Sequence, residues 1–386
     1  MRKNNINTQI DGYAEIQQEI AVLEKYALDR GAERGQVKRA VDWLHPKTLN
    51  LRVSEIREET ESTTTFRLVS LDGYLPPFQA GQYINLFMEI GGVRTSRPYS
   101  ISSSPTQLAY YDITVRRVDD GFVSTFLLDK VGVGAEFQST SPSGQFYHNP
   151  LFHGDDLVFI AGGSGITPFM SMIREMSDRD RSRRIQLIYG NRSSQDMIFN
   201  KKIEKRSARH GNLTVHTVIS EPEQGYDGLT GFITADLITE LVDNIHDKMV
   251  YVCGPEAMYT FVLSELSKLD IPKRRIRVEV FGPPSDVTCQ PGWPEDLNAA
   301  DSFSVAFKGH DTIQARAGEP LMNSLERAGI VLEASCRSGE CSLCRTKLIS
   351  GKVFQPKGVK LRKSDRVYGY IHPCMAYPLE DLEIRI

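Results

Sequence analysis

The chain has 386 residues, enough for two to four domains that each bury a core of their own. Apolar residues make up 40% and charged residues 25%, and 46 basic side chains stand against 49 acidic ones, for a net charge of −3. This even balance argues against a nucleic-acid or anionic-membrane partner. No apolar run is long enough to span a bilayer, and the amino terminus lacks the apolar core of a signal peptide, so we expect a soluble, cytoplasmic protein.

Residues 1–46 predict a helical extension. Apolar side chains recur every three or four positions in two runs, which indicates two amphipathic helices on either side of Gly31. The first run is Ile10, Tyr13, Ile16, Ile20, Leu23 and Tyr26, and the second is Val37, Ala40, Val41 and Leu44. A hairpin packed on the next domain is the simplest interpretation. Dimerisation through this extension, or docking of a partner on it, is the alternative.

Residues 47–151 predict an antiparallel β-barrel. Short segments of alternating polarity are separated here by Gly, Pro and Asp, at spacings that suit such a barrel. The segments cover residues 49–56, 64–71, 82–90, 111–118 and 135–142.

Residues 152–284 predict a parallel sheet with helices on both faces, because buried strands alternate with helical segments. The strands are expected at 156–161, 184–190, 213–219, 248–254 and 275–281, and the helices at 168–176, 198–207, 234–242 and 256–269. A stretch rich in Pro and Gly, 285–301, reads as a linker to a last domain, 302–386. The whole chain is therefore predicted to be a multidomain α+β protein.

Four of the six cysteines lie in the last fifth of the chain. Cys336, Cys341 and Cys344 form a C-x4-C-x2-C motif, and Cys374 follows after 29 residues. This is the spacing of plant-type [2Fe–2S] sites, in which four thiolates bind two irons, two thiolates per iron. Structural zinc is disfavoured, because zinc sites usually pair two C-x2-C turns and only one is present. Cys289 is interpreted as a small buried hydrophobe.

The residues around these cysteines, over about 302–386, resemble the plant-type ferredoxin module. The resemblance implies a β-grasp fold with a low-potential, one-electron cluster near the surface, where one edge is available to a partner.

Two further motifs resemble the ferredoxin–NADP reductase superfamily over about 47–284. They are Arg97-Pro98-Tyr99-Ser100, at the end of a barrel strand, and Gly121-Phe122-Val123-Ser124. The resemblance implies that Arg97 meets the flavin diphosphate with a charge-assisted contact, and that Ser124 and the amides of 122–124 complete the phosphate site beside Gly121.

The same resemblance implies that Tyr99 packs along the flavin and that Ser100 lies near flavin N5. Val115 begins a stretch, 115–125, which together with 141–146 looks like members that use FAD. FAD is therefore preferred, and FMN is the alternative.

The stretch 162–168, GGSGITP, joins a strand to a helix and matches the same superfamily. A loop that opens onto a helix N-terminus is suited to a pyrophosphate, here of NAD(P)H. Gly163 and Gly165 allow the tight turn, Thr167 is the expected N-cap, and Pro168 suits the first helical turn. A simple tight turn between strand and helix is the alternative.

Cys253-Gly254-Pro255, followed by Met258, resembles the family's C-G-P motif. The resemblance places Cys253 beside nicotinamide C4, where it shapes hydride transfer without acting as a nucleophile. It also places Glu279 and Phe281, at the end of the last strand, near the isoalloxazine. Ser100, Cys253 and Glu279 are thus the candidate catalytic residues.

The adenosine ribose is expected at the carboxyl end of the second strand, at Gly190, Asn191 and Arg192. Arg192 could pair with the 2′-phosphate of NADPH. However, the nearby Asp196 would repel that phosphate, and no dense cluster of cations follows this strand to bind it. NADH is therefore preferred, and NADPH is the alternative.

These features predict an NAD(P)H-dependent reductase that passes electrons through flavin to a [2Fe–2S] cluster and on to a separate redox protein, such as an oxygenase or hydroxylase component. Flavin is the component that accepts a hydride and releases its electrons singly. A self-contained diaphorase for small acceptors is one alternative. A non-enzymatic redox sensor or assembly subunit is the other.

Overall fold

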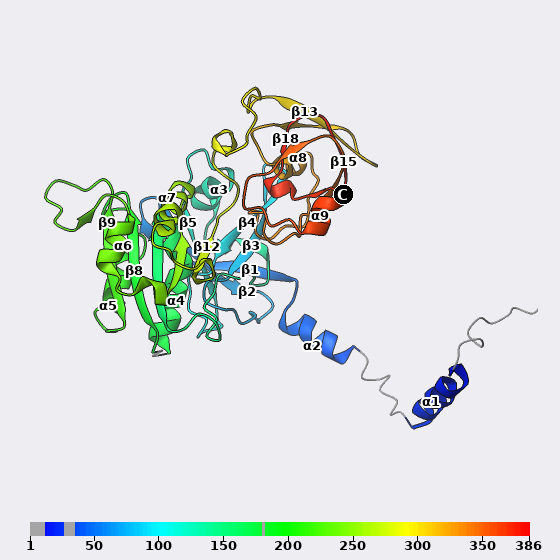
Figure 1. Ribbon diagram of the computed structural model, residues 1–386, viewed down its shortest axis with the longest axis horizontal. Coiled ribbons are helices and arrows are strands. Elements are labelled where there is room, and N and C mark those ends of the chain that lie inside the picture. Colours follow the sequence, from blue (N-terminus) through cyan, green and yellow to red (C-terminus); the bar gives the residue numbers. More distant parts are fainter. Residues whose placement is uncertain (1–11, 27–34, 180–181) are drawn as a thin grey trace, which may run out of the picture. The chain divides into compact units, whose positions relative to one another are not determined.

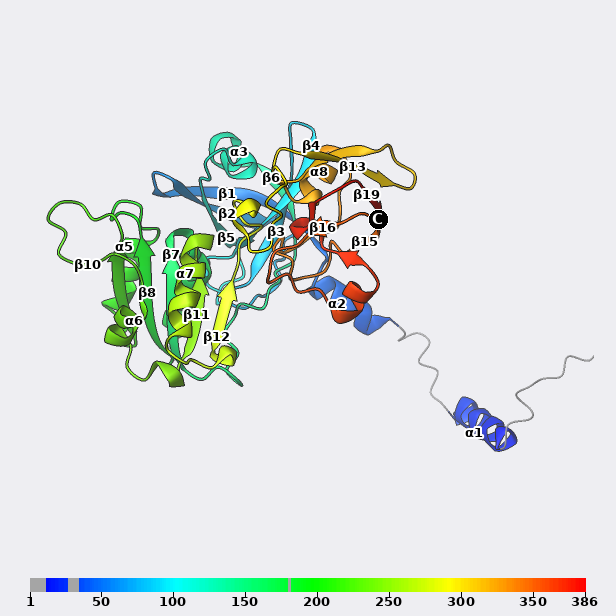
Figure 2. The ribbon, with the colours of Figure 1, turned by 45° about the horizontal axis from the view of Figure 1, so that its top comes forward.

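Figures 1 and 2 show the computed structural model of the chain, which describes residues 12–26, 35–179 and 182–386. The chain forms two compact units, Met1–Pro46 and Lys47–Ile386. Within the described residues, no helix is both long and apolar enough to cross a membrane.

The first unit contains the two predicted helices, α1 (Tyr13–Tyr26) and α2 (Gln36–Leu44). In its described part no helical side chain is buried, and Leu23 and Trp43 are each about two-thirds exposed. Ile10 and Gly31 lie outside the described residues. Packing on the next domain and dimerisation through this unit both stay predictions.

The second unit begins with the predicted antiparallel barrel. Its strands are β1 (Thr48–Thr60), β2 (Thr63–Ser70), β3 (Tyr83–Ile90), β4 (Val93–Ser100), β5 (Tyr111–Arg116) and β6 (Glu136–Thr140). They are ordered β4-β3-β6-β1-β2-β5 with antiparallel neighbours. A bridge between Ile101 and Ile113 joins the two edge strands and closes the sheet around a core that includes Leu51 and Ile84.

Helix α3 (Phe122–Lys130) covers part of this core and is absent from the sequence prediction. Its residues FVSTFLLDK are apolar on most sides, so they show no 3.6-residue alternation of polarity. Burial of Val123 and Leu127 against the barrel stabilises the helix instead.

The central sheet confirms the predicted parallel α/β arrangement (Figure 2). Its strands are β7 (Asp156–Gly162), β8 (Arg184–Asn191), β9 (Leu213–Ile219), β10 (Leu229–Thr230), β11 (Met249–Cys253) and β12 (Ile276–Glu279). They are ordered β10-β9-β8-β7-β11-β12, and all neighbours are parallel. The strand order reverses between β7 and β11, so the loops that follow these two strands diverge at a switch point suited to ligands.

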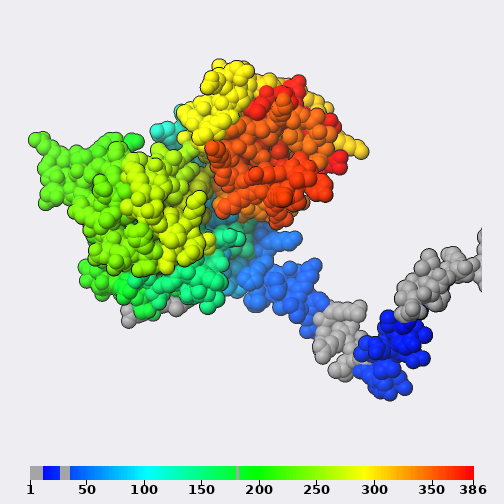
Figure 3. Space-filling view, in the orientation of Figure 1, coloured from blue at the N-terminus to red at the C-terminus, as the bar shows by residue number. Residues whose placement is uncertain are grey.

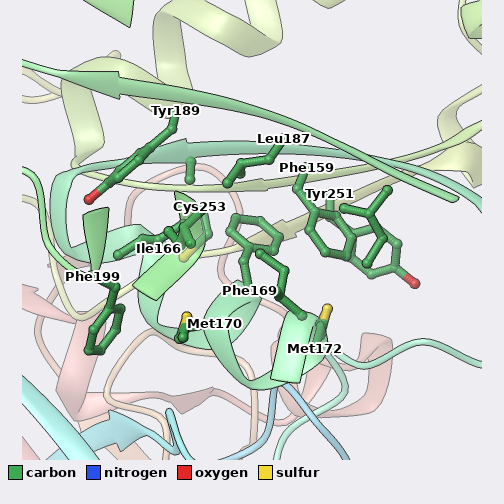
Figure 4. Packing of buried hydrophobic residues seen from close by; sticks show 14 of the residues in the cluster. Phe159, Ile166, Phe169, Met170, Met172, Leu187, Tyr189, Phe199, Tyr251 and Cys253 are labelled. Carbon is green, nitrogen blue, oxygen red and sulfur yellow. The ribbon is translucent and has the colours of Figure 1, made fainter. Parts of the chain in front are cut away.

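Helices cover both faces of this sheet. They are α4 (Ile166–Asp178), α5 (Asn200–Ser207), α6 (Ala235–Leu241) and α7 (Glu256–Ser267). α4 and α5 pack on one face, where Phe159 stacks on Phe169 at 4.7 Å between ring centroids (Figure 4). α6 and α7 pack on the other face, around Val158 and Val252.

The carboxy-terminal module has the β-grasp arrangement that the ferredoxin resemblance implies. Its main sheet contains β13 (Ser302–Phe307), β14 (Ile313–Arg316), β15 (Thr346–Ser350), β17 (Tyr370–Ile371) and β19 (Leu382–Arg385), and β16 (Val353–Phe354) pairs with β18 (Tyr377–Pro378). The order β14-β13-β19-β15-β17 makes β13 and β19 a central parallel pair. Helix α8 (Leu321–Arg327) packs Leu321 and Leu325 on this sheet, and α9 (Lys363–Val367) precedes β17.

Candidate functional site

The four predicted ligand cysteines lie close together in two pairs. The Cys344 and Cys374 sulfurs are 3.4 Å apart, and the Cys341 thiol hydrogen-bonds Cys336. All four are free thiols, and three of them are buried. In the described part of the chain, no group of three or more His, Cys, Asp or Glu side chains is arranged to hold a single metal ion. Two pairs of thiols suit a two-iron cluster, in which each iron takes two cysteines.

The backbone of the ligand loop, 336–344, favours a thiolate at Cys336. The amides of Ser338, Glu340 and Cys341 donate to its sulfur at 3.5, 3.3 and 3.3 Å. Hydrogen bonds from the Cys341 thiol and then from the Cys341 and Ser338 amides lower the Cys336 pKa to about 4, although burial opposes the shift. Gly339, with a φ of 77°, permits the turn, since a Cβ there would lie 3.1 Å from Met375 and Val359. Amide-lined thiolates are what an iron–sulfur cluster requires.

A narrow pocket brings three distant parts of the chain together. Pro98 and Ser100, two residues apart on β4, lie in it with Tyr83. The other walls come from the end of β12 and from the ligand loop: Glu279, Val280, Phe281, Cys336, Ser338 and Glu340. Residues predicted to lie near the flavin and a predicted cluster ligand therefore share one pocket.

Ser100 supplies a test of whether a flavin fits this pocket. Its side chain is 4% exposed, and its Oγ finds no hydrogen-bond partner among the described residues. A buried hydroxyl without a partner costs about 1–3 kcal/mol, so a polar ring edge that reaches Ser100 removes this cost. The pocket chemistry thus fits a flavin.

Arg97 and Tyr99 do not line this pocket. Tyr99 packs against the barrel core, and burial raises the pKa of its hydroxyl. Arg97 donates to Thr95 Oγ1 at 2.8 Å and to the Ser96 carbonyl at 2.7 Å. Alternation along β4 explains the difference, because neighbouring side chains on a strand point to opposite faces.

A buried polar network joins the flavin strand to the ligand loop. The Thr95 hydroxyl donates to Glu326 Oε2 on α8 at 2.9 Å, and Arg337 of the ligand loop pairs with Glu326. Arg337 also reaches Thr95 Oγ1 at 3.3 Å. Nearby, Asn85 Nδ2 donates to the Ala334 carbonyl at 2.7 Å. These contacts hold the barrel directly against the cluster module.

The network carries more positive than negative charge. The Glu326 carboxylate pairs with Arg337, and the guanidinium group of Arg97 lies near both without an ion pair of its own among the described residues. Burial and then the charge of Arg337 lower the Arg97 pKa to about 10, although Glu326 opposes the shift. An added phosphate beside Arg97 would balance this charge, which fits the predicted flavin diphosphate.

The second flavin motif forms the N-terminus of α3. A Cβ on Gly121 would lie 2.3 Å from Ser124 Oγ and 2.8 Å from the Val118 carbonyl, so the turn requires glycine. Ser124 Oγ accepts from the Val118 amide at 3.1 Å. The first amides of α3, from Phe122 onward, have no partner inside the helix and can meet a phosphate.

The other two residues predicted here, Val123 and Val115, are both buried. The Val123 side chain is buried, and Val115 is buried in the barrel core, so Val115 offers a cofactor only its backbone.

The glycine-rich turn after β7 packs on the end of β11. A Cβ on Gly165 would lie 2.2 Å from the Cys253 carbonyl, and one on Gly163 would lie 2.6 Å from the Arg116 guanidinium. The expectation that Thr167 is the N-cap is wrong. A 3-10 turn at Gly163–Gly165 runs into α4, so Gly165 is the cap and Thr167, inside the helix, donates to the Ser164 carbonyl at 2.7 Å. Pro168 lies in the first turn, as predicted.

Cys253 ends β11 directly beside Glu279, its register partner on β12. Its side chain is fully buried against the packing around Ile166 (Figure 4), and burial followed by the charge of Glu279 raises its thiol pKa. A neutral, buried thiol is a poor nucleophile, and the role of Cys253 beside the nicotinamide stays a prediction. Burial, followed by the charges of Glu340 and Cys336, raises the Glu279 pKa to about 8.

Gly254, Pro255 and Met258 pack against the glycine-rich turn. A Cβ on Gly162 or on Gly254 would lie 2.3 Å from the Met258 sulfur, and Pro255 is the N-cap of α7. The two motifs after β7 and β11 therefore meet at the switch point of the sheet.

The end of β8 offers a second unsatisfied polar group. Asn191, which follows Gly190, is 8% exposed, and both atoms of its amide lack partners in the described part of the chain. The adjoining Arg192 is exposed and lies 3.5 Å from Glu221. A nucleotide ribose and phosphate would satisfy Asn191, so the site fits the predicted adenosine end.

The sequence analysis took Asp196 as the acid that opposes a 2′-phosphate beside Arg192, but Asp196 contacts the barrel instead. It accepts hydrogen bonds from Thr60 and Ser62 at 2.7 Å each and pairs with Arg116, all on the barrel. It therefore contributes to the contact between modules. Glu221, just after β9, is the acid beside Arg192, and sequence reasoning missed it. Examining every strand end at the carboxyl edge would have found it.

Three family models match the chain in succession. They are the oxidoreductase FAD-binding domain at 50–148, the oxidoreductase NAD-binding domain at 159–264, and the 2Fe-2S iron-sulfur cluster binding domain at 307–379.

Relatives match over most of their length. A glycine betaine monooxygenase reductase subunit of Chromohalobacter salexigens is 27% identical over 87% of this chain and 94% of its own. An NADH oxidoreductase of Escherichia coli is 28% identical over 86% of this chain and 96% of its own. The ferredoxin reductase component of a Mycobacterium tuberculosis 3-ketosteroid-9-alpha-monooxygenase is 28% identical over 86% of this chain and 94% of its own.

Solved structures share the fold. Phthalate dioxygenase reductase has a TM-score of 0.65 at 23% identity, over 88% of this chain and 98% of its own. The FAD/NAD-binding domain of a Vibrio cholerae nitric oxide dioxygenase has a TM-score of 0.56 at 28% identity, over 61% of this chain and all of its own.

Proposed function

We propose that this chain, which belongs to the ferredoxin–NADP reductase superfamily and ends in a [2Fe–2S] ferredoxin domain, is the reductase component of a multicomponent oxygenase. It is an NAD(P)H-dependent flavin and iron–sulfur oxidoreductase that supplies a separate redox protein. An oxygenase as that protein is supported by relatives that are reductase components of monooxygenases.

The observation that carries the proposal is the shared pocket. Ser100 from the flavin strand, Glu279 from the end of β12 and Cys336 from the ligand loop line the same space. Bound FAD accepts a hydride and releases two electrons singly, whereas a [2Fe–2S] cluster carries one electron at a time. A chain that places both sites at one pocket can couple the two.

Each motif has a role in holding these groups. Arg97, Tyr99 and the α3 N-terminus would hold FAD, and the four cysteines would hold the cluster. The turn at 163–168 and the Asn191–Arg192 end of β8 would hold the dinucleotide. Ser100 would donate a hydrogen bond to the flavin ring. Cys253 keeps a neutral, dry surface next to the nicotinamide position. The partly buried Glu279, which shares the pocket with Ser100, can form a hydrogen bond with the flavin ring.

NADH is the proposed dinucleotide. Glu221 lies 3.5 Å from Arg192, so its carboxylate neutralises the arginine that would otherwise favour a 2′-phosphate. The same carboxylate can accept hydrogen bonds from the free ribose hydroxyls of NADH.

The experiment compares Cys341→Ser with Cys289→Ser, a matched change outside the cluster. Cys289 is exposed, so its interpretation as a buried hydrophobe is wrong. Cys341→Ser should lose iron but keep FAD, and stopped-flow mixing with NADH should bleach its flavin absorbance at the wild-type rate. Reduction of ferricyanide should persist, whereas reduction of cytochrome c should fall at least about tenfold, because the one-electron exit is lost. Cys289→Ser should match wild type throughout.

Undiminished cytochrome c reduction by the iron-free protein would contradict the relay and favour a diaphorase. Failure of NADH to bleach the flavin of the wild-type protein would favour a redox sensor.

A further inference from the structure

A segment rich in exposed cations lies next to the ligand loop. Residues 357–366, here called the cationic segment, contain five Lys or Arg side chains and one acid. The cations are all exposed: Lys357, Lys360, Arg362, Lys363 and Arg366. The acid, Asp365, is buried and pairs with Arg345 at 3.0 Å. The surface that the segment presents is therefore strongly positive.

Three contacts fix the cationic segment against the ligand loop. The Lys360 amide donates to the Gly339 carbonyl at 3.0 Å, and its Nζ lies 2.6 Å from Glu340. The Arg345–Asp365 pair ties α9 to the residue that directly follows Cys344. The segment is thus held to both halves of the loop that carries three of the four ligand cysteines.

Most of these cations have no acidic partner within the chain. Among the described residues, Lys360 pairs with Glu340, whereas Lys357, Arg362, Lys363 and Arg366 form no ion pair. The whole module, 302–386, carries 13 Lys and Arg against 9 Asp and Glu, although the full chain has a net charge of −3. Positive charge is therefore concentrated in the module from which electrons leave.

Large apolar side chains are exposed beside these cations. Leu343, between the ligands Cys341 and Cys344, is 51% exposed, and Val367 and Tyr368, at the end of α9, are 71% and 65% exposed. Figure 3 shows the orange and red atoms of this module as a broad part of the surface. Exposed apolar residues bordered by charges are typical of protein–protein contacts.

We propose that Leu343, the cationic segment, Val367 and Tyr368 form the docking surface for the electron acceptor, and that this acceptor is an acidic protein. Its surface would place carboxylates around an apolar patch near its own redox centre. The inference rests on the proposed function, since it assigns the partner of the same cluster. Charge complementarity would steer the encounter, and the apolar contact at Leu343 would bring the partner next to the ligand loop.

The electron count sets the stoichiometry. Oxidation of one NADH to NAD⁺ releases two electrons and one proton. Each acceptor protein takes one electron from the reduced cluster, which is thereby reoxidised. Two acceptor molecules are therefore reduced for each NADH oxidised, in two separate docking events.

The test reverses charge at this surface and at a matched control. Lys363→Glu/Arg366→Glu alters two exposed cations on α9, and Lys201→Glu/Lys205→Glu alters two exposed cations on α5, in the nucleotide module. The probes are the soluble domain of cytochrome b5, an acidic one-electron acceptor, and cytochrome c, a basic one. Iron content and visible spectra confirm that both variants retain FAD and cluster.

At low ionic strength, the α9 variant should reduce cytochrome b5 about tenfold more slowly than wild type, and it should reduce cytochrome c faster. The α5 variant should stay within about twofold of wild type for both probes. Wild-type reduction of cytochrome b5 should fall as salt is added, because salt screens the attraction.

Isothermal titration of cytochrome b5 gives a readout that does not depend on turnover, and binding should weaken in the α9 variant alone. Equal loss in both variants, or no change in the α9 variant, would overturn the docking surface. Ferricyanide reduction separates this failure from that of the proposed function, since it needs NADH and flavin but no docking. It should stay at the wild-type rate in both variants.

Discussion

Three buried or partly buried polar residues, Ser100, Asn191 and Arg97, differ in what they would gain from a bound cofactor. Ser100 and Asn191 are buried and have polar atoms without partners in the described structure, so both are arranged for a ligand. Arg97, in contrast, already bonds Thr95 and Ser96, and its charge adds to that of Arg337. The side chains of the first two residues lack hydrogen-bond partners among the described residues, whereas Arg97 has no ion pair there to balance its charge.

Replacing Ser100 and Arg97 should therefore have different effects. Arg97→Ala should weaken FAD retention about ten- to a hundredfold, since a charge-assisted contact contributes about 1.5–3 kcal/mol. Ser100→Ala should keep FAD but slow its reduction by NADH, and it should not lower the stability of the flavin-free protein. Equilibrium dialysis, stopped-flow absorbance and thermal unfolding measure these effects. Equal loss of FAD in both variants would contradict the assignment.

Glu221 should govern the choice between NADH and NADPH. Glu221→Arg removes the acid beside Arg192 and adds a second cation, so kcat/KM for NADPH should rise by about tenfold or more. Asp196→Asn is the control, because its partners are on the barrel; it should leave the NADH/NADPH ratio unchanged. Steady-state ferricyanide assays with both dinucleotides measure the ratio. A larger change in the NADH/NADPH ratio for Asp196→Asn than for Glu221→Arg would show that Asp196, not Glu221, governs the dinucleotide preference.

Among the elements, strand β4 and the ligand loop form the closest functional contact. β4 presents Ser100 to the pocket and Thr95 to the interface, and the loop presents Cys336 to the pocket and Arg337 to the same interface. The network of Thr95, Glu326 and Arg337 therefore fixes where the cluster lies with respect to the flavin strand.

Arg337→Gln should destabilise this contact strongly. It leaves Glu326 buried without its charge partner, which typically costs about 3–5 kcal/mol. The double variant Arg337→Gln/Glu326→Gln should recover much of this loss, because neither side chain then carries a charge. Urea unfolding of the two single variants and the double variant measures the coupling. Additive losses would mean that the two residues do not interact as described.

The same variants should separate structure from electron transfer. In Arg337→Gln, flavin reduction by NADH should keep its wild-type rate, whereas the subsequent absorbance change of the cluster should slow. A change in both rates by the same factor would point to a general loss of folded protein instead.

On the scale of the whole molecule, Lys47–Ile386 is a compact unit separate from the amino-terminal helices. It contains every residue assigned to FAD, dinucleotide and cluster. The helices α1 and α2 expose apolar side chains, which gives the amino-terminal unit a surface that another protein or a second copy could cover.

A chain that begins at Lys47 should therefore keep its cofactors. Its visible spectrum, iron content and NADH–ferricyanide activity should stay within about twofold of the full chain. If residues 1–46 mediate dimerisation, sedimentation should show a dimer for the full chain and a monomer for the shortened one. Loss of FAD on shortening would show that the amino-terminal unit contributes to the flavin site.

Local patterns in the sequence were sufficient for most of the fold. The strands and helices of 152–284 follow from alternating buried and amphipathic runs, and the cluster ligands follow from cysteine spacing, because both depend on residues close together in the chain. Two predictions failed for local reasons. α3 lacks an alternation of polar and apolar residues, and a 3-10 turn precedes α4, so its N-cap is Gly165 and not Thr167.

The tertiary structure alone decided which side chains meet. Thr95 bonds Glu326 across 231 positions, and Asp196 is held by Thr60 across 136 positions, so neither contact leaves a periodic or spacing signal. The acid beside Arg192 proved to be Glu221 because parallel strands bring their carboxyl ends to one edge of the sheet. The chemistry of each motif can thus be predicted from residues that are neighbours in the sequence. Which motifs contact each other depends on how the modules pack.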